Sequence, residues 1–215
     1  MYSFPRFALL STFVLTLCSF ISAADDAPAN SELVVDESFD KAELGKKWHV
    51  NTGNWSIQEG VLRVSEVAAD KHSAAARYAV ETDNAVYQLR FRLINKAKMF
   101  HFGFDPKPGE LEKKGHLFSV IVTPTSWKIM KHIDKARPKE APNETLVEQE
   151  RKFELGQWYT LRVTTWGQFV NAKIDDEDPL KAAHPTFGVK KPTLVFRCIG
   201  DGVEIDDIKV WQQNR

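Results

Sequence analysis

Short segments in which apolar and polar residues alternate run through the middle and the end of this chain. In residues 86–93, Tyr87, Leu89 and Phe91 share one parity, whereas Gln88 and Arg90 share the other. A period of two is typical of antiparallel strands that are buried on one face. The same alternation occurs in residues 100–104, 118–122, 158–163, 170–174 and 203–210.

These segments predict an all-β fold. No internal segment keeps the 3.6-residue period of an amphipathic helix for long. From the turn signals between the segments we expect about eleven to thirteen strands, which favours two packed sheets over one open sheet. The fold class is therefore an antiparallel two-sheet β-sandwich. Residues 132–156 carry prolines and many charges, and we expect a long surface excursion there with a short edge strand at residues 145–149.

Two local features refine this prediction. In the stretch from Asp36 to Val64, large apolar side chains are expected to enter the core, and Gly60 is expected to take the positive φ of a tight turn. Near the end of the chain, Val203 and Ile205 fall on one parity but Ile208 and Val210 fall on the other. A β-bulge at residues 206–207 would turn all four side chains inward.

The first 24 residues indicate export. Arg6 precedes an apolar run that ends in small residues, which is typical of a secretory signal peptide. A membrane anchor would need a longer apolar run, and lipid attachment at Cys18 would need a small residue where Leu17 stands. We expect a secreted or periplasmic protein with residues 1–24 as signal peptide, 25–32 as a mobile stretch and 33–215 as a single domain.

Charge and cysteine content limit the partners. Lys plus Arg and Asp plus Glu both number 29, and this balance argues against nucleic acid as a partner. No stable membrane insertion is expected after processing. Only Cys198 would remain, so no intramolecular disulfide can form. The oligomeric state is left open by the sequence.

Several segments resemble one known family. They are W-x6-W-x-I-x-E-G-V-L from Trp48, GHLFSVIVTP from Gly115, LGQWYTLRVTTWGQFVNAKIDD from Leu155 and GVEIDDIKVW from Gly202. Together they resemble exported bacterial proteins of the 3-keto-disaccharide hydrolase domain type. The resemblance implies a concanavalin A-like jelly roll, a fold shared by laminarin-cleaving glucanases and many lectins.

A jelly roll of this type would hold its ligand on the outward face of its concave sheet, and the expected partner is a carbohydrate. Polar side chains on the non-core parity are then the candidate ligand-binding residues: Arg90, Arg92, Arg162, Arg197, Asn171 and Lys173. Trp127 and Trp166 are candidates for stacking on a sugar ring. The alternative is an ordinary solvated face whose arginines pair with acidic residues on neighbouring strands.

Catalysis is a second hypothesis. A 3-keto sugar has an acidified C2 hydrogen, so a base and cationic donors would permit elimination followed by addition of water. His101 and His116 are the candidate catalytic bases, with Arg90, Arg92 or Arg162 as donors. Arg90, Arg92 and His101 are expected to share one face, since all three lie on the parity opposite to the core residues of their segments. The residues EIDD from Glu204 match only half of the carboxylate motif of laminarin-cleaving enzymes, because Lys209 stands where its last Glu would be. A structural envelope protein without ligand is the third hypothesis.

The only cofactor that the sequence suggests is a structural calcium ion. Asp36 and Asp206 would approach each other if the first and last strands pair, and hard oxygen ligands would suit a structural calcium ion. The acidic residues 175–178 are better explained as a solvated hairpin end. The histidines lack the spacing of a zinc site.

Overall fold

The computed structural model describes residues 27–214, and the expected signal peptide lies outside this range. The described chain forms thirteen antiparallel strands and two short 3-10 helices. In chain order these are β1 (Ser31–Glu37), β2 (Trp48–Thr52), β3 (Asn54–Gln58), β4 (Val61–Ser65), η1 (Ala68–Asp70), β5 (Ala74–Thr82), β6 (Ala85–Phe104), β7 (Phe118–Val122), β8 (Ser126–Lys131), β9 (Glu144–Glu150), β10 (Tyr159–Trp166), β11 (Phe169–Ile174), β12 (Leu180–Ala183), η2 (Pro185–Phe187) and β13 (Lys191–Gln213).

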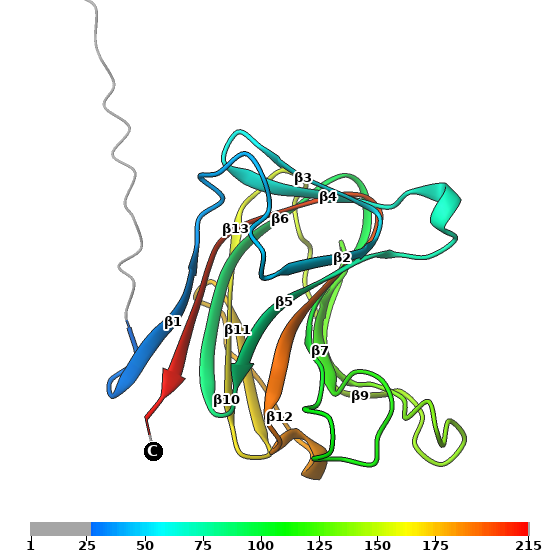
Figure 1. Cartoon of the computed structure of the whole chain (residues 1–215). Helices are drawn as coiled ribbons and strands as arrows, with labels where there is room; N and C mark the ends of the chain where they lie inside the picture. The colour runs from blue at the N-terminus through cyan, green and yellow to red at the C-terminus, as the bar shows by residue number, and fades with distance from the viewer. Residues whose placement is uncertain (1–26, 215) are drawn as a thin grey trace, which may run out of the picture.

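The strands form two layers that share two long strands, β6 and β13 (Figure 1). The first layer has the order β12-β11-β10-β6-β13-β4-β3, and β1 pairs with the end of β13. In the second layer, β9-β8-β7 lie on one side of the β6–β13 pair and β5-β2 on the other. The sandwich is therefore one continuous hydrogen-bonded sheet that folds over onto itself.

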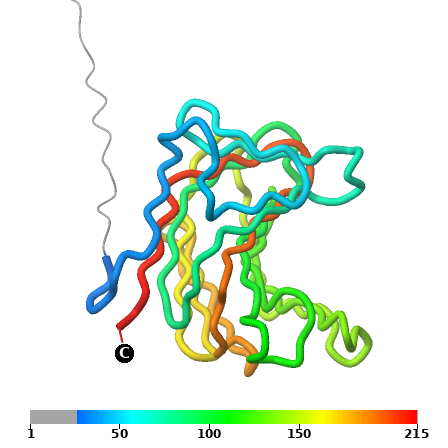
Figure 2. The backbone as a smooth tube through the Cα atoms, in the orientation of Figure 1, coloured from blue at the N-terminus to red at the C-terminus, as the bar shows by residue number. Residues whose placement is uncertain are grey.

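The fold-over is visible within β6 itself. The rings of Tyr87 and Phe104, which belong to opposite ends of this strand, have centroids only 4.7 Å apart. Seventeen residues of straight strand would span roughly 55 Å, so β6 must bend back. Figure 2 shows this arch together with the matching curve of β13.

Bulges and glycines permit the bend. The β6–β13 register shifts between Ile199 and Gly200 and again between Asp201 and Val203. Gly200 has φ 91°, and a Cβ atom at this position would lie 2.3 Å from the carbonyl oxygen of Lys96. Glycine is therefore required where the two long strands turn together from one layer to the other.

The space between the layers is filled by aromatic and aliphatic side chains. Tyr87, Phe91, Phe102 and Phe196 are each at most 1% exposed, and the ring centroids of Phe102 and Phe196 lie 5.4 Å apart. The Tyr87 hydroxyl is hydrogen-bonded to Thr82 Oγ1 at 2.8 Å, so its polar atom is satisfied. Burial of one such ring contributes about 1.5–3 kcal/mol, which makes this aromatic core the main stabilising element.

Most local predictions are confirmed. Phe39, Trp48 and Leu62 are buried, and Gly60 has φ 76° in a two-residue turn. The register between β6 and β13 shifts between Asp206 and Lys209, and the four apolar side chains around the expected bulge are all buried. Strand β9 pairs only with β8 among the described strands, as expected for an edge strand.

Two boundaries differ from expectation. Residues 86–93 and 100–104 belong to one strand, β6, whose apolar parity changes from odd to even at the bend. Strand β1 begins at Ser31, where residues 31 and 32 pair with Gln213 and Gln212. Residues 31 and 32, the last two of the stretch that we expected to be mobile, are therefore part of the sheet.

We expect Gly200→Ala to destabilise the protein strongly, because it forces a side chain into positive φ and against backbone atoms of Lys96 and Lys98. The backbone conformation alone costs about 1–3 kcal/mol, and each kcal/mol lowers Tm by roughly 2–4 °C in a chain of this size. Thermal denaturation measures the effect. Gly45→Ala is the control, since a Cβ atom there meets nothing within 4 Å, and an equal Tm for both variants would contradict the prediction.

Candidate functional site

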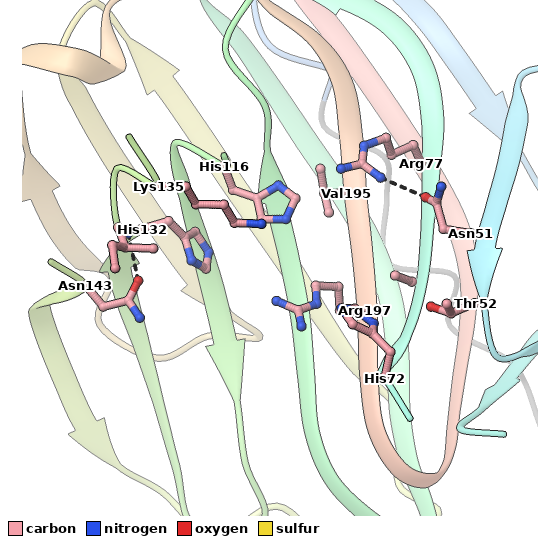
Figure 3. Close-up of a pocket in the computed structure, with 12 residues that line it drawn as sticks. Asn51, Thr52, His72, Arg77, His116, His132, Lys135, Asn143, Val195 and Arg197 are labelled. Atoms are coloured by element: carbon pink, nitrogen blue, oxygen red, sulfur yellow. Dashed lines mark hydrogen bonds between the residues drawn. The ribbon is translucent and has the colours of Figure 1, made fainter. Parts of the chain in front are cut away.

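A hollow of about 500 Å³ lies on the outward face of the second layer. Strands β2, β5 and β13 contribute one side of it, and the segments that flank β7 and β8 contribute the other (Figure 3). We call this site the hollow. Its lining residues are Asn51, Thr52, His72, Ala75, Arg77, His116, His132, Ile133, Lys135, Asn143, Val195 and Arg197.

Small residues at the centre of this face leave room for the hollow. Ala75 and Val195 line it, and Gly103 is paired with Val195 on the neighbouring strand. A Cβ atom on Gly103 would lie 2.2 Å from Ser119 Oγ and 2.9 Å from the Phe118 carbonyl oxygen. The absence of a side chain at residue 103 therefore allows the Ser119 hydroxyl to lie against the sheet.

Asp105 organises one end of the hollow. Its carboxylate accepts hydrogen bonds from His116 Nδ1 at 2.5 Å, from Arg77 Nε at 2.8 Å and from Thr193 Oγ1 at 3.1 Å. Burial raises the pKa of Asp105, but the hydrogen bonds and charges of His116 and Arg77 outweigh it and lower the pKa to about 2. An ionised carboxylate only accepts, so Nδ1 of His116 carries the proton of this hydrogen bond.

Two further histidines lie close to this end. His132 Nε2 and Ser119 Oγ are 2.7 Å apart, and the ring centroid of His132 lies 5.4 Å from that of His116 and 6.4 Å from that of His101. Burial, followed by nearby positive charges that include Arg197, lowers the pKa of both His101 and His132 to about 3. Both imidazoles are therefore neutral at pH 7.

Arg197 lies across the hollow from His116 and His132 (Figure 3). Its Nε and Nη2 atoms donate to the Ser73 hydroxyl oxygen at 3.2 and 2.8 Å. Burial, followed by the charge of Arg77, lowers the pKa of Arg197. Arg77 is held more firmly, because it donates both to Asp105 and, through Nη1 at 2.7 Å, to Asn51 Oδ1.

The arginines that the sequence predicts to share one binding face lie on two different layers of the sandwich. His101, His116 and Arg197 belong to the second layer, and the last two line the hollow. Arg90 and Arg92 lie on the part of β6 that belongs to the first layer, so they face the opposite side of the sandwich. The expectation that Arg90, Arg92 and His101 share one face is therefore wrong, because β6 crosses from one layer to the other between them.

The first-layer arginines have partners of their own. The guanidinium carbons of Arg90 and Arg92 lie 4.8 and 4.6 Å from the ring centroid of Trp158. Arg92 Nε is 2.5 Å from Glu204 Oε2, while Arg162 donates to Gln88 and lies over Trp211. This surface matches the alternative of an ordinary solvated face with paired charges.

The remaining candidates from the sequence are also placed away from the hollow. Trp127 is fully buried in the core, which rules out the stacking role expected of it. Trp166 is 57% exposed at the β10–β11 turn of the first layer. On β11, Asn171 is exposed, and Lys173 Nζ lies 3.7 Å from Asp176 Oδ1.

The expected pairing of the first and last strands is present, but the two aspartates on them are not opposite each other. Asp36 is paired with Lys209, whereas Asp206 is paired with Arg90. Burial, followed by the neighbouring Asp207, raises the pKa of Asp206. Among residues 27–214, no group of three or more His, Cys, Asp or Glu side chains is placed to hold a metal ion.

Sequence reasoning missed Arg77, Asp105, Ser119 and His132. Arg77 belongs to a strand that begins with three alanines, so its alternation is weak. Asp105 follows the last residue of β6 and His132 follows the last residue of β8. Asp105 and His132 share one feature that the sequence could have revealed: each is an ionisable residue directly after a buried strand. Both strands belong to the layer that also carries Arg197.

Similarity to known proteins is confined to structure. No family model matches the sequence, and no curated protein is similar to it. The chain is similar to SCLam, a non-specific endo-β-1,3(4)-glucanase of family GH16, with TM-score 0.66, 14% identity and coverage of 87% of this chain and 93% of that one. It is also similar to the catalytic domain of a laminarinase from Thermotoga petrophila, with TM-score 0.62, 12% identity and coverage of 86% and 99%.

A third similar structure is the carbohydrate-binding module CBM66 from Bacillus subtilis, with TM-score 0.53, 12% identity and coverage of 78% of this chain and 92% of that one. The predicted jelly-roll fold is thereby confirmed. At these identities the likeness defines the fold of the chain. Among the described residues, no helix has the length and apolar character needed to cross a bilayer.

We expect the free energy of unfolding to fall as the pH is lowered from 6.5 towards 3. The native state holds His101 and His132 neutral, with pKa values of about 3 against 6.5 when unfolded. Their stabilising effect is therefore complete above pH 6.5 and is lost below it, by about 1–3 kcal/mol for each histidine at pH 4. The native pKa of Asp105 is about 2, so its contribution is lost at lower pH.

Urea denaturation at pH 7, 6, 5 and 4 measures this dependence. His132→Gln should show a shallower decline than the parent protein, because one of the two titrating groups is gone. His49→Gln, which alters an exposed histidine on β2, should leave the slope unchanged. A stability that stays constant from pH 7 to pH 4 would show that the two buried histidines are not held neutral.

Proposed function

We propose that this chain is an exported protein that binds a glycan in the hollow. The observation that carries the proposal is the hollow itself, a cavity of sugar size on an outward sheet face of a jelly roll. The solved structures of similar fold support it, since they are described as glucanases and as a carbohydrate-binding module. Export is expected from residues 1–24, so the glycan would be met outside the cytoplasm.

The lining of the hollow suits hydrogen bonding to a sugar. Asn51, Thr52 and Asn143 offer amide and hydroxyl groups, while Arg77 and Arg197 offer guanidinium donors. The lining residues include no Phe, Tyr or Trp, so stacking of a ring on an aromatic face is not available in the hollow. Affinity would therefore come mainly from hydrogen bonds, and the position of each hydroxyl group of the sugar would decide specificity.

Cleavage of a 3-keto glycoside is the second candidate function, and the geometry of His116 favours it. Nδ1 of His116 is hydrogen-bonded to Asp105, so Nε2 of His116 would act as the base at the edge of the hollow. His116 would remove the C2 proton of the sugar, and the C1 substituent would leave with the bonding electrons. Water would then add to the resulting enone. Arg197, in place of the first-layer arginines, would stabilise the enolate oxygen.

Two carboxylates acting together are not available to the hollow, because no Asp or Glu is among its lining residues. Glu204, from the half motif in the sequence, lies in the first layer and is paired with Arg92 and Arg63. The usual acid and nucleophile pair of a glycosidase would need two such groups on either side of the bond. Any cleavage in the hollow would therefore follow the elimination route.

Replacement of Arg197 by Ala should weaken glycan binding by about ten- to a hundredfold, since it removes charge-assisted hydrogen bonds. The measurement is a glycan array followed by calorimetric titration of the best ligand, with mature protein whose mass matches a chain that starts near Asp25. Arg90→Ala is the matched control, because Arg90 lies on the opposite side of the sandwich. Equal losses in both variants, or loss only in Arg90→Ala, would place the binding site elsewhere.

Release of free sugar from a 3-keto disaccharide tests the second function. His116→Ala should abolish the release, whereas His49→Gln should leave it unchanged. Binding on the array without release in the parent protein would reject the enzymatic function and keep the first proposal. If the parent protein neither binds a glycan on the array nor releases free sugar, both proposed functions are rejected and a structural envelope protein without ligand remains.

A further inference from the structure

The charges that line the hollow are all of one sign. Arg77, Arg197 and Lys135 are cationic, and none of the twelve lining residues is Asp or Glu. The whole chain, by contrast, carries 29 basic and 29 acidic residues. Asp105 pairs with Arg77 at one end of the hollow, which leaves Arg197 and Lys135 as lining cations without an acidic partner among the described salt bridges, and an excess of positive charge favours an anionic ligand.

Arg197 is the partly buried cation of the hollow that has no counter-ion among the described residues. Within residues 27–214, no carboxylate lies within salt-bridge distance of its guanidinium, which donates hydrogen bonds to the neutral hydroxyl of Ser73. Most arginines of the first layer are, by contrast, paired with acids or stacked on tryptophan. Partial burial removes water from the Arg197 guanidinium, and a neutral hydroxyl replaces that hydration only in part.

The carboxylate of Asp105, at one end of the hollow, already has hydrogen-bond partners other than Arg197. It accepts from His116, Arg77 and Thr193 together. His132 and His101 are held neutral by burial and by nearby positive charges that include Arg197. The protein therefore supplies donors to this part of the hollow but supplies no anion to balance Arg197.

We propose that the hollow takes an acidic saccharide, with the carboxylate or sulfate group of the sugar placed against Arg197. This inference rests on the proposed function and names the class of ligand. The guanidinium donors that do not reach Ser73 would bind the two oxygens of a carboxylate side by side, a geometry that favours arginine over lysine. Lys135 is exposed beside the hollow and adds to the attraction of the anion.

Titration with matched oligosaccharides tests the proposal. The acidic probes are tetragalacturonic acid, which carries carboxylates, and a chondroitin sulfate tetrasaccharide, which carries both carboxylates and sulfates. The neutral probes are cellotetraose and laminaritetraose. Acetate and sulfate ions alone show whether the anion suffices without the sugar. Each titration is run at about 50 and 300 mM salt, since screening weakens a charge-dependent contact.

We expect at least one acidic probe to bind tenfold or more tightly than both neutral probes, and to lose affinity at the higher salt concentration. Arg197→Gln should remove most of this preference, and Arg197→Lys should restore only part of it because the planar fork is lost. Arg90→Gln, on the opposite face, is the control and should keep the preference.

The outcomes separate the two proposals. Equal binding of neutral and acidic probes, with no effect of Arg197→Gln on the preference, overturns the acidic ligand and leaves glycan binding in place. Failure of every saccharide to bind overturns both. Binding of acetate or sulfate as tight as that of the acidic tetrasaccharides overturns recognition of a saccharide, since the sugar then contributes nothing.

Discussion

The pairing of β6 with β13 is the interaction on which the rest of the structure depends. These two strands are hydrogen-bonded along most of their length, from Leu194 opposite Phe104 to Gln212 opposite Ala85. Every other strand is attached directly or through neighbours to one of them. Both strands bend together at Gly200 and Gly202 of β13, so the hydrogen bonds between β6 and β13 continue from one layer into the other. The aromatic core is enclosed between the two halves of these same strands.

The same bend explains why two surfaces with different chemistry occur on one strand pair. On the first layer, Arg92 and Glu204 are opposite each other in register and form an ion pair, so charge on that face is balanced locally. On the second layer, Arg197 is opposite His101 and next to Ala75, neither of which can balance it. Small neighbours leave space above Arg197, and the missing acid leaves its charge available to a ligand.

Much of the fold follows from sequence pattern, because alternation reports directly which side chains face a core. The inward positions of residues 87–93 and the bulge after Asp206 are of this kind. Parity along a strand shows which side of its sheet a residue faces, yet it does not show which layer the residue belongs to. Parity alone therefore predicts that Arg90 and His101 share a face, although the change of apolar parity between Leu93 and Phe100 marks the crossing from one layer to the other. Asp105 and His132 lie beyond strand ends, where tertiary packing decides their positions.

The position of β13 in the chain has a consequence for the order of folding. Its pairings with β6 join residues more than a hundred positions apart, such as Tyr87 with Val210, and contacts of this separation form slowly. Since β13 is central to both layers yet is the last strand in chain order, neither layer is complete until the final part of the chain is present. The aromatic core between the layers can therefore be enclosed only after β13 has been synthesised.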